Sequence, residues 1–353
     1  MAGTDYPVNS PLAVKRWSNE LMKEALKKTF ALQFMGTDSN ALIQIKTELN
    51  KGPGDRLTFG LRQQLGGAGV QGDSTLEGNE EALVTYSQNV TIDQLRHAVR
   101  SSGKMSEQRV PFTIRDEARD GLADWWSERI DRWFFNQITG NSGQADVRFT
   151  GLQTCTAPDS GHAVYPGAET AEASLSNTTS NRFSLALIDK AVEKGKLAVN
   201  YLRPVRVGAK DLLVAFLHPY QVTSLRQSLS GSTQWADIQK AAMQGGEITD
   251  NPIFTGALGL YNGVVLHESV RIPSTLAGDA NNNVVRAVLC GAQAACLAFG
   301  RGYGKNTFSW KEELFDYENQ LGVAAGCIGG LVKTRFNGSD FATVTMSTYE
   351  VAS

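Results

Sequence analysis

The segment LGGAGVQGDSTLEGNEEAL, from Leu65 to Leu83, contains three glycines in the GxGxxG spacing of the dinucleotide-binding fingerprint. They are Gly67, Gly69 and Gly72. That fingerprint binds a nucleotide only where a strand leads into it and a helix leads out, because the pyrophosphate lies on the helix N-terminus. Here apolar residues alternate with polar ones on both sides, over residues 55–65 and 84–93. Strand, glycine-rich loop and strand make a hairpin, so we predict no nucleotide site.

The predicted hairpin is long. At about 3.3 Å per residue each arm would extend roughly 30 Å, whereas common strands extend about 17–20 Å. The tip, from about Gln63 to Ala82, has no periodicity of its own, and compact domains seldom carry such a loop. Because a two-stranded ribbon is marginally stable alone, we expect it to lie against another surface, from the same chain or from a neighbour. Gln88 is the one residue that breaks the alternation of the second arm.

A basic amphipathic helix is predicted near the N-terminus. It begins at Ser10-Pro11, where a hydroxyl N-cap precedes a proline at the first helical position, and its apolar face continues to Phe30. The basic residues of its outer face are Lys15, Arg16, Lys23, Lys27 and Lys28. Such a helix can bind a membrane or nucleic acid, but docking on protein is the commoner role.

A second helix is predicted from Phe112 to Thr139, where apolar residues recur at helical spacing and Gly140 provides a C-terminal stop. It carries six carboxylates between Asp116 and Asp131. No ExxH motif accompanies them, as it does in the metal sites of helical bundles. We therefore interpret them as solvated or inter-subunit charge.

The remaining chain mixes helices and strands, which predicts an α+β fold. Polar residues over 141–181 predict long loops. Helices are predicted at 184–199, 219–229 and 234–243, and strands at 211–217, 257–267, 284–289, 331–336 and 341–348. Asn337-Gly338, between the last two strands, is a strong hairpin-turn signal. The length of 353 residues suits about two domains.

The amino-acid composition limits the classes of molecule that we expect the protein to bind. A formal net charge of −2 provides no strong field toward nucleic acid or membranes. No apolar run approaches the eighteen or so residues of a membrane span, and the first residues lack signal-peptide features, so we expect a protein kept in a cytoplasm. The cysteines lack CxxC spacing, which predicts no zinc site, and three of the four lie in Ala/Gly/Leu-rich context, which predicts buried thiols. The four cysteines are Cys155, Cys290, Cys296 and Cys327.

Motifs of catalysis are incomplete. GYGKNT, at residues 302–307, lacks both the preceding glycine and the Ser or Thr of a phosphate-binding loop. His267-Glu268 does not continue into HExxH, and no GxSxG elbow is present. We predict no cofactor, no metal and no enzymatic activity.

Eight stretches of the chain match one known family, in order and over nearly the whole length. They are KGPGDRLTFGLRQQLGGAGVQGD (51–73), TLEGNEE (75–81), DQLRHAVRSSGKMSEQR (93–109), IDRWFFNQITG (130–140), FLHPYQVTSLR (216–226), NPIFTGALGLYNGVVLHES (251–269), GAQAACLAFG (291–300) and DYENQLGVAAGCIGGLVKTRFNGSDFATVTM (316–346). With the order of predicted elements, they resemble the major capsid proteins of tailed bacteriophages, which have the Hong Kong 97 type fold. The eight stretches are most similar to the branch of major capsid proteins found in N4-like podophages.

The resemblance implies a division into parts. These are an N-terminal arm (1–45), an extended loop over the adjacent subunit (46–103), a peripheral domain (104–204) with a spine helix (112–139), an axial domain (about 205–300) and C-terminal strands returning to the peripheral domain (301–353). It also implies a function, in which hexamers and pentamers of this chain form an icosahedral shell around double-stranded DNA. Assembly would take place in the bacterial cytoplasm, with portal, scaffolding and decoration proteins as partners and no membrane. With net charge near zero, the shell would hold DNA by confinement and not by tight phosphate binding.

The same resemblance assigns contacts between subunits to the extended loop and the N-terminal helix. Glycines at the tip would let the arm follow a neighbour's surface, and its acids would meet basic side chains. The candidate residues are Arg56, Arg62, Gly67, Gly69, Gly72, Asp73, Glu77, Glu80, Glu81, Lys15, Arg16, Lys23 and Lys27. The type member of the fold cross-links a loop lysine to an asparagine of a neighbour. Because no lysine lies between Lys51 and Lys104, we predict a shell held by non-covalent contacts.

Two alternatives remain. A cellular nanocompartment can have a shell of the same fold, and it would lack neighbouring terminase and portal genes. An enzyme with a glycine-rich lid at 65–83 would form a small oligomer, whereas a capsid protein forms particles of megadaltons.

Overall fold

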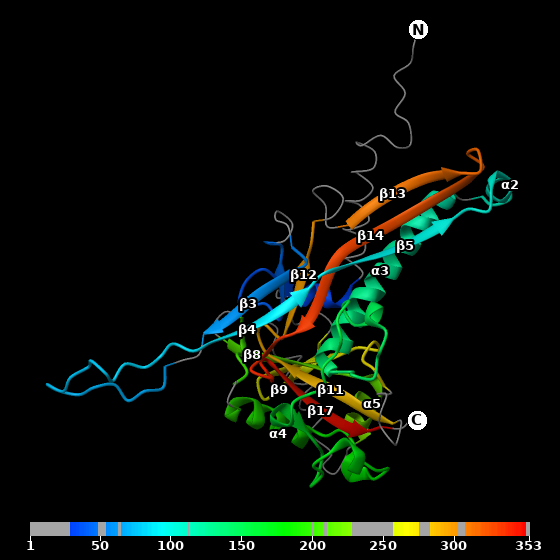
Figure 1. Ribbon diagram of the computed structural model, residues 1–353. Helices are drawn as coiled ribbons and strands as arrows, with labels where there is room; N and C mark the ends of the chain where they lie inside the picture. The colour runs from blue at the N-terminus through cyan, green and yellow to red at the C-terminus, as the bar shows by residue number, and fades with distance from the viewer. Residues whose placement is uncertain are drawn as a thin grey trace.

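The computed structural model describes residues 29–48, 54–62, 65–111, 113–198, 201–207, 210–227, 257–274, 283–301 and 308–350. The predicted basic helix before residue 29, the predicted helix at 234–243 and the glycine-rich segment at 302–307 lie outside these residues. Two sheets and one long helix organise the described chain, and a narrow arm extends from them (Figure 1).

The first sheet has six strands and is centred on β14 (Gln320–Lys333). The order is β1 (Met35–Gly36), β2 (Ile43–Lys46), β12 (Ala295–Phe299), β14 and β13 (Phe308–Phe315), and β5 (Asp93–Arg100) also pairs with β14. β14 pairs antiparallel with β5 over 322–329 and with β13 over 320–327. Gly330 lets the chain pass against β4 (Thr85–Thr91), because a side chain there would collide with the Thr91 carbonyl. A segment of the hairpin and the C-terminal region therefore share one sheet.

The second sheet has seven strands and forms the lower lobe in Figure 1. The order is β6 (Ala163–Val164), β17 (Thr343–Tyr349), β11 (Val284–Cys290), β8 (Lys210–Leu217), β10 (Val264–Glu268) and β9 (Ala257–Tyr261), and β7 (Val205–Val207) pairs with β8. All seven residues of β11 are buried, as expected of a central strand. Apolar residues of α4 (Leu185–Leu197) and α5 (Pro219–Gln227) share a buried cluster with this sheet.

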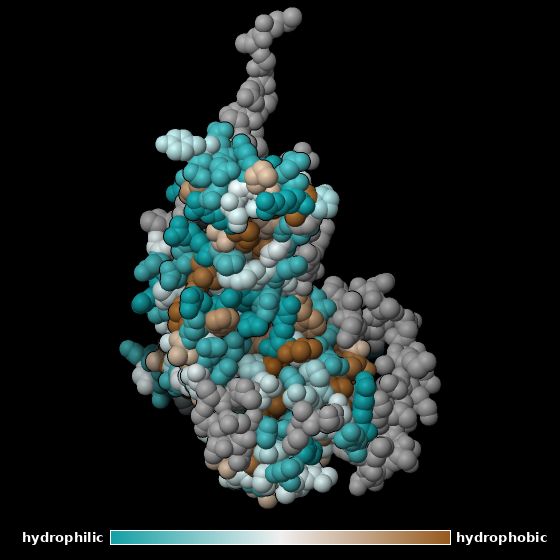
Figure 2. All heavy atoms as spheres, turned by 90° about the vertical axis from the view of Figure 1, so that its right-hand side faces the viewer, coloured by the Kyte–Doolittle hydropathy of each residue, from teal (hydrophilic) through white to brown (hydrophobic). Residues whose placement is uncertain are grey.

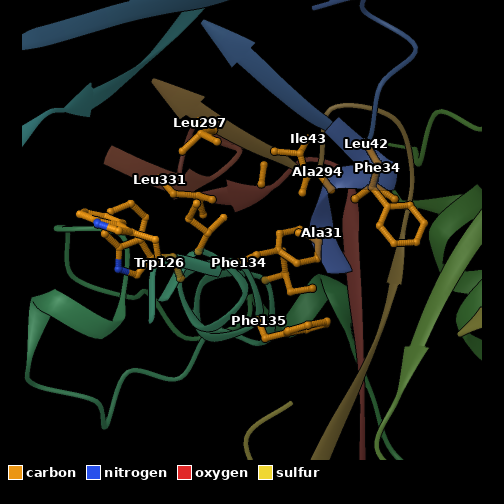
Figure 3. Close-up of a cluster of buried hydrophobic side chains, with 14 of the residues drawn as sticks. Ala31, Phe34, Leu42, Ile43, Trp126, Phe134, Phe135, Ala294, Leu297 and Leu331 are labelled. Atoms are coloured by element: carbon orange, nitrogen blue, oxygen red, sulfur yellow. The ribbon is translucent and has the colours of Figure 1, made fainter. Parts of the chain in front are cut away.

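The long helix α3 (Ile114–Thr139) joins the two lobes. It ends at Gly140, whose φ of 64° lies in the left-handed region that glycine favours. Its ring side chains pack on the first sheet, where the Trp126 and Phe308 centroids lie 4.9 Å apart. Figure 3 shows Trp126 and Phe134 among side chains from β12, β14 and the segment around Ala31. The helix, the first sheet and residues 30–43 thus have one core.

Most long elements of the described chain occur where the periodicity predicts them. This holds for α3, α4, α5, β8 and β11. The predicted Asn337-Gly338 turn is also confirmed, since β15 (Arg335–Phe336) pairs with β16 (Ser339–Asp340) around it. The strands on either side of that turn enter different sheets, β14 the first and β17 the second.

Other predictions need correction. The single strand predicted at 257–267 is the hairpin of β9 and β10, because Asn262 (φ 46°) and Gly263 (φ 75°) form a tight turn. The short helix α2 (Lys104–Gln108) precedes α3. The loops at 141–181 contain four 3₁₀ turns and strand β6, which pairs parallel with β17.

Candidate assembly surface

The predicted hairpin is present, although its arms are shorter than expected. β3 (Arg56–Arg62) and β4 (Thr85–Thr91) pair antiparallel, with Arg56 opposite Thr91 and Arg62 opposite Thr85. Seven residues span about 24 Å, not 30 Å. Beyond β4 the chain continues as β5 into the first sheet, so the last part of the predicted extended loop (46–103) pairs with the body.

The base of the hairpin is attached to the body by its apolar face. Leu57 and Val90 are buried with Ile92 and with two residues of β12. Phe59 packs edge-on against Phe336, with ring centroids 6.0 Å apart. The alternation that predicted the strands therefore describes a real buried face.

Gln88 breaks that alternation because its amide bonds to the backbone. Its Nε2 donates to the Lys333 carbonyl at 2.7 Å, and its Oε1 accepts from the Arg335 N–H at 2.6 Å. Lys333 ends β14 and Arg335 begins β15. The Gln88 amide therefore provides hydrogen-bond partners for two backbone groups where the chain passes from one strand to the next. A polar residue on the apolar face of this strand thus marks a place where a side chain makes hydrogen bonds to the backbone.

The loop tip, defined as residues 65–84, contains no helix or strand and extends away from the body (Figure 1). Four large apolar side chains in it are between 43% and 62% exposed. They are Leu65, Leu76, Leu83 and Val84. Apolar side chains at this density on a projecting arm are typical of a surface that another molecule covers.

Two of the four acids of the loop tip have partners within it. The Glu81 carboxylate accepts from the N–H groups of Gly66 and Gly67, at 2.9 and 2.7 Å, and Glu80 accepts from the Gly78 N–H at 2.8 Å. The loop is therefore closed at its base by its own chain. Asp73 and Glu77 are exposed.

The glycines of the tip have a conformational role. Gly69, Gly72 and Gly78 have φ values of 71°, 66° and 87°, a region that other residues seldom adopt. The chain after Gly72 leads into β4 with no helix between, which is the arrangement that the hairpin prediction required. Gly67 contributes its N–H to Glu81.

We expect the closure of the loop base to depend on pH. The two backbone hydrogen bonds lower the pKa of Glu81 below its ordinary value of 4.5. A carboxyl with a depressed pKa contributes its stabilisation above the ordinary pKa and loses it as pH falls through the depressed value. Amide exchange at Gly66 and Gly67 should therefore be slow near neutral pH and accelerate, relative to other loop amides, as the pH falls well below 4.5. Equal acceleration in the Glu81→Gln variant would contradict this.

Two of the remaining candidate residues lie at the two ends of β3. Arg56 is exposed at the start of β3, and Arg62 ends that strand. Lys15, Arg16, Lys23 and Lys27 lie outside the described residues. Contact between the basic helix and the acidic tip of neighbouring subunits stays a prediction.

One acid of α3 does not fit the interpretation as solvated or inter-subunit charge. Asp131 is buried, and its carboxylate accepts from the N–H groups of Phe30 and Ala31 at 3.1 and 2.9 Å. Arg271 lies 3.0 Å away as its counter-charge. Burial raises the pKa of Asp131, although these partners oppose the shift. The carboxylate fixes the segment that begins at residue 29 to the middle of the helix, a contact that no sequence pattern signals.

The cysteines are free, and Cys290, Cys296 and Cys327 are buried as predicted. Burial raises the pKa of Cys155 and of Cys296 to about 12, so these thiols are unreactive near neutral pH. Within the described ranges no group of histidines, cysteines and acids is placed to hold a metal ion. No helix in those same ranges is long and apolar enough to cross a membrane.

Comparison with known proteins identifies the family of this chain. The model of a phage capsid protein family matches residues 5–352. The chain belongs to the phage capsid protein family. A curated major capsid protein of Pseudomonas phage KPP25 is 29% identical over 367 aligned residues, which cover 94% of this chain and 93% of the relative.

Solved capsid structures agree with this family assignment. The capsid of Ralstonia phage GP4 is 35% identical, with a TM-score of 0.81 over 99% of both chains. The capsid of cyanophage Pam1 is 19% identical, with a TM-score of 0.72 over 93% of this chain and 94% of that one, and shows the same fold. The Hong Kong 97 type fold is therefore confirmed, whereas the N4-like branch stays a prediction.

Proposed function

We propose that this chain is the major capsid protein of a tailed phage, and that its copies form the hexamers and pentamers of an icosahedral shell around double-stranded DNA. The loop tip is the observation that supports this most directly. It projects from the body with four exposed apolar side chains, and its hydrogen bonds described above join residues of the tip to one another. A neighbouring copy would supply the surface that such an arm needs.

We assign the parts of the shell subunit from the two sheets. The first sheet with α3 would be the peripheral domain, and the second sheet with α4 and α5 would be the axial domain. The extended loop would comprise residues 46–103, of which the last strand, β5, enters the first sheet and joins the loop to the peripheral domain. Because β17 pairs with β11, we place the last strand in the axial domain, and only β13 and β14 of the C-terminal region in the peripheral domain.

The proposed shell implies further binding partners for the subunit. Portal and scaffolding proteins would act during assembly, and decoration proteins would bind outside. With a formal net charge of −2, the subunit would enclose DNA by confinement in the virion. The chain would act as a structural protein without catalysis, assembled in the cytoplasm of its bacterial host.

Electron microscopy tests the proposal. The chain should be expressed alone and with its genomic neighbours, and the products separated by size. We expect closed particles of megadalton mass with hexameric and pentameric capsomers. Monomers or dimers as the sole products under both conditions would overturn the proposed function, and a small catalytic oligomer would favour the lid enzyme.

We also expect the mature shell to be non-covalent. The extended loop has no lysine between Lys51 and Lys104, and arginine cannot replace it because guanidinium stays protonated. Particles boiled in detergent with reductant should therefore run as a single band near 38.2 kDa. A ladder of multimers that resists reductant would show that cross-linking occurs through other residues.

A further inference from the structure

Two exposed turns of this chain have the same sequence and nearly the same backbone. Asn262-Gly263 connects β9 to β10, and Asn337-Gly338 connects β15 to β16. The two asparagines have φ values of 46° and 52°, and the two glycines have φ values of 75° and 77°. All four residues are exposed. No other Asn-Gly pair occurs in the sequence, so the two turns form a matched pair.

An asparagine followed by glycine can react with its own backbone. The glycine nitrogen loses its proton to a base in solution and attacks the asparagine Cγ. The Cγ–Nδ2 bond breaks, and Nδ2 takes up a proton and leaves as ammonia. Water then opens the cyclic imide at either carbonyl, which gives aspartate or isoaspartate. Glycine favours the attack because it has no side chain to crowd its nitrogen.

The surroundings of the Asn262 turn oppose this reaction. Asn262 Nδ2 donates to Asp189 Oδ1 at 2.9 Å, and the Tyr261 hydroxyl donates to the other oxygen of the same carboxylate at 2.9 Å. The Asn262 amide has to break its hydrogen bond before Cγ can turn toward the Gly263 nitrogen. The negative charge of Asp189 also disfavours deprotonation of that nitrogen.

The surroundings of the Asn337 turn favour the reaction. Neither the Asn337 amide nor the Gly338 N–H has a hydrogen-bond partner among the described residues. A Cβ placed on Gly338 would meet no atom within 4 Å, so the space around it is open. Arg335 Nη2 donates to the Gly338 carbonyl, and a cation at this place favours an anionic nitrogen. The nearby Asp340 carboxylate is balanced by Lys333 Nζ at 2.9 Å.

We propose that Asn337 is a site of spontaneous deamidation and that Asp189 protects Asn262 from the same reaction. The two turns share their sequence, their backbone and their exposure. They differ in the partner of the asparagine amide and in the sign of the charge beside the turn. The difference in reactivity therefore follows from the fold and not from the Asn-Gly sequence.

The Asn337 turn lies beside the base of the hairpin formed by β3 and β4. Phe336 is buried and packs edge-on against Phe59 of β3, and the Arg335 N–H donates to Gln88 of β4. A new carboxylate on a subunit whose surface is mainly hydrophilic (Figure 2) stays solvated. Isoaspartate, however, adds a methylene group to the backbone of a two-residue turn, which misaligns β15 with β16. Deamidation should therefore loosen the hairpin where it joins the body.

Peptide mass spectrometry of the purified full-length chain tests the proposal. The chain is kept in mildly alkaline buffer and digested at intervals, and the peptides that contain residues 262 and 337 are quantified, with aspartate and isoaspartate separated by chromatography. We expect Asn337 to convert at least about tenfold faster than Asn262, the factor expected when a hydrogen bond to a charged group has to break first. Equal rates at the two sites, or no conversion at Asn337, would overturn the inference. Because the chain is measured before assembly, a failure to form shells would overturn the proposed function alone.

The variant Asp189→Ala tests the cause of the difference. It removes both the hydrogen bond and the negative charge at Asn262, and it lies far from Asn337 in the sequence. We expect the rate at Asn262 to rise toward the rate at Asn337, which should not change. An unaltered rate at Asn262 would show that Asp189 does not protect it and would overturn that part of the proposal.

Hydrogen exchange measures the effect on the hairpin. Peptides that span β3 and β4 should exchange faster in the aged chain than in the fresh chain, because local opening at the hairpin base becomes easier. Asn337→Gln is the control, since the longer side chain cyclises far more slowly, and its exchange should not change with age. Unchanged exchange in the unmodified chain after conversion to isoaspartate would overturn the proposed loosening.

Discussion

Deleting Gly66–Glu80 and joining the arms with Asn-Gly should abolish shell assembly and leave the subunit folded. The hydrogen bonds described for the loop tip stay within it, such as Asn79 N–H to the Leu76 carbonyl at 3.0 Å. The buried contacts of the hairpin lie at its base, with Leu57 and Val90. Because loop tips carry few core contacts, the thermal midpoint of the unassembled subunit should change by no more than about 2–4 °C. Calorimetry of the subunit and electron microscopy of the assembly reaction measure the two effects.

A matched variant separates the length of the loop from its chemistry. Replacing Leu65, Leu76, Leu83 and Val84 by serine keeps the loop length and the acids, and removes the exposed apolar surface. We expect this variant to assemble poorly as well, since apolar burial contributes most of the free energy of protein association. A fall of many degrees in the midpoint of the deleted subunit would show that the loop belongs to the core. Normal shells from the deletion variant would refute its role between subunits.

The elements that could be predicted from the sequence are those that local patterns determine. The period of α3, its stop at Gly140 and the alternation at Leu57 and Val90 all reflect burial of one face, which the order of residues records directly. The Asn337-Gly338 turn could be read in the same way. Asn262-Gly263 carries the same signal, but the apolar residues on both sides of it predict one continuous strand.

Contacts between distant segments could not be predicted in this way. The carboxylate of Asp131 meets backbone amides about a hundred residues away, and one acid of a charged helix has no pattern that separates it from its neighbours. The ion pair of Arg115 with Glu312 depends on the approach of α3 to β13, which is a property of the packed fold. The break in alternation at Gln88 was visible, yet its two backbone partners lie some 245 residues away.

Arg286 is another residue whose role appears only in the fold. It lies on β11 of the second sheet, 8% exposed, and its Nη1 donates to the Thr139 and Gly140 carbonyls at 3.1 and 2.8 Å. These carbonyls end α3, where the helix dipole favours a cation. Its Nη2 donates to Glu172 at 2.6 Å, and Ser347 of β17 donates to the same carboxylate at 2.6 Å. One guanidinium therefore joins the helix of the first lobe to the sheet of the second.

Replacing Arg286 by methionine, which keeps the length and removes the charge, should lower the free energy of unfolding by about 2–3 kcal/mol, because the half-buried Glu172 would lose its counter-charge and two charge-assisted hydrogen bonds. Arg286→Lys is the control and should lose less, since it keeps the charge but not the forked geometry. The pH dependence of the loss in stability distinguishes a lost counter-charge from a packing defect. Burial raises the pKa of Glu172, but the bonds and charge of Arg286 outweigh it and hold that pKa below 4.5. In the wild-type protein the Arg286–Glu172 pair therefore stabilises the folded state above the ordinary pKa of Glu172. This stabilisation is lost as the pH falls through the lowered pKa.

In the Arg286→Met variant the pKa of Glu172 should shift in the opposite direction. Burial without a counter-charge would raise the pKa of Glu172 above its ordinary value, so the folded state would bind the proton more tightly than the unfolded state does. The destabilisation relative to wild type should then shrink as the pH falls from about 7 to about 4, measured by urea unfolding of the unassembled subunit. A loss that is the same at both pH values would indicate a packing defect at β11. A loss below about 1 kcal/mol would show that the two lobes hold together without this arginine.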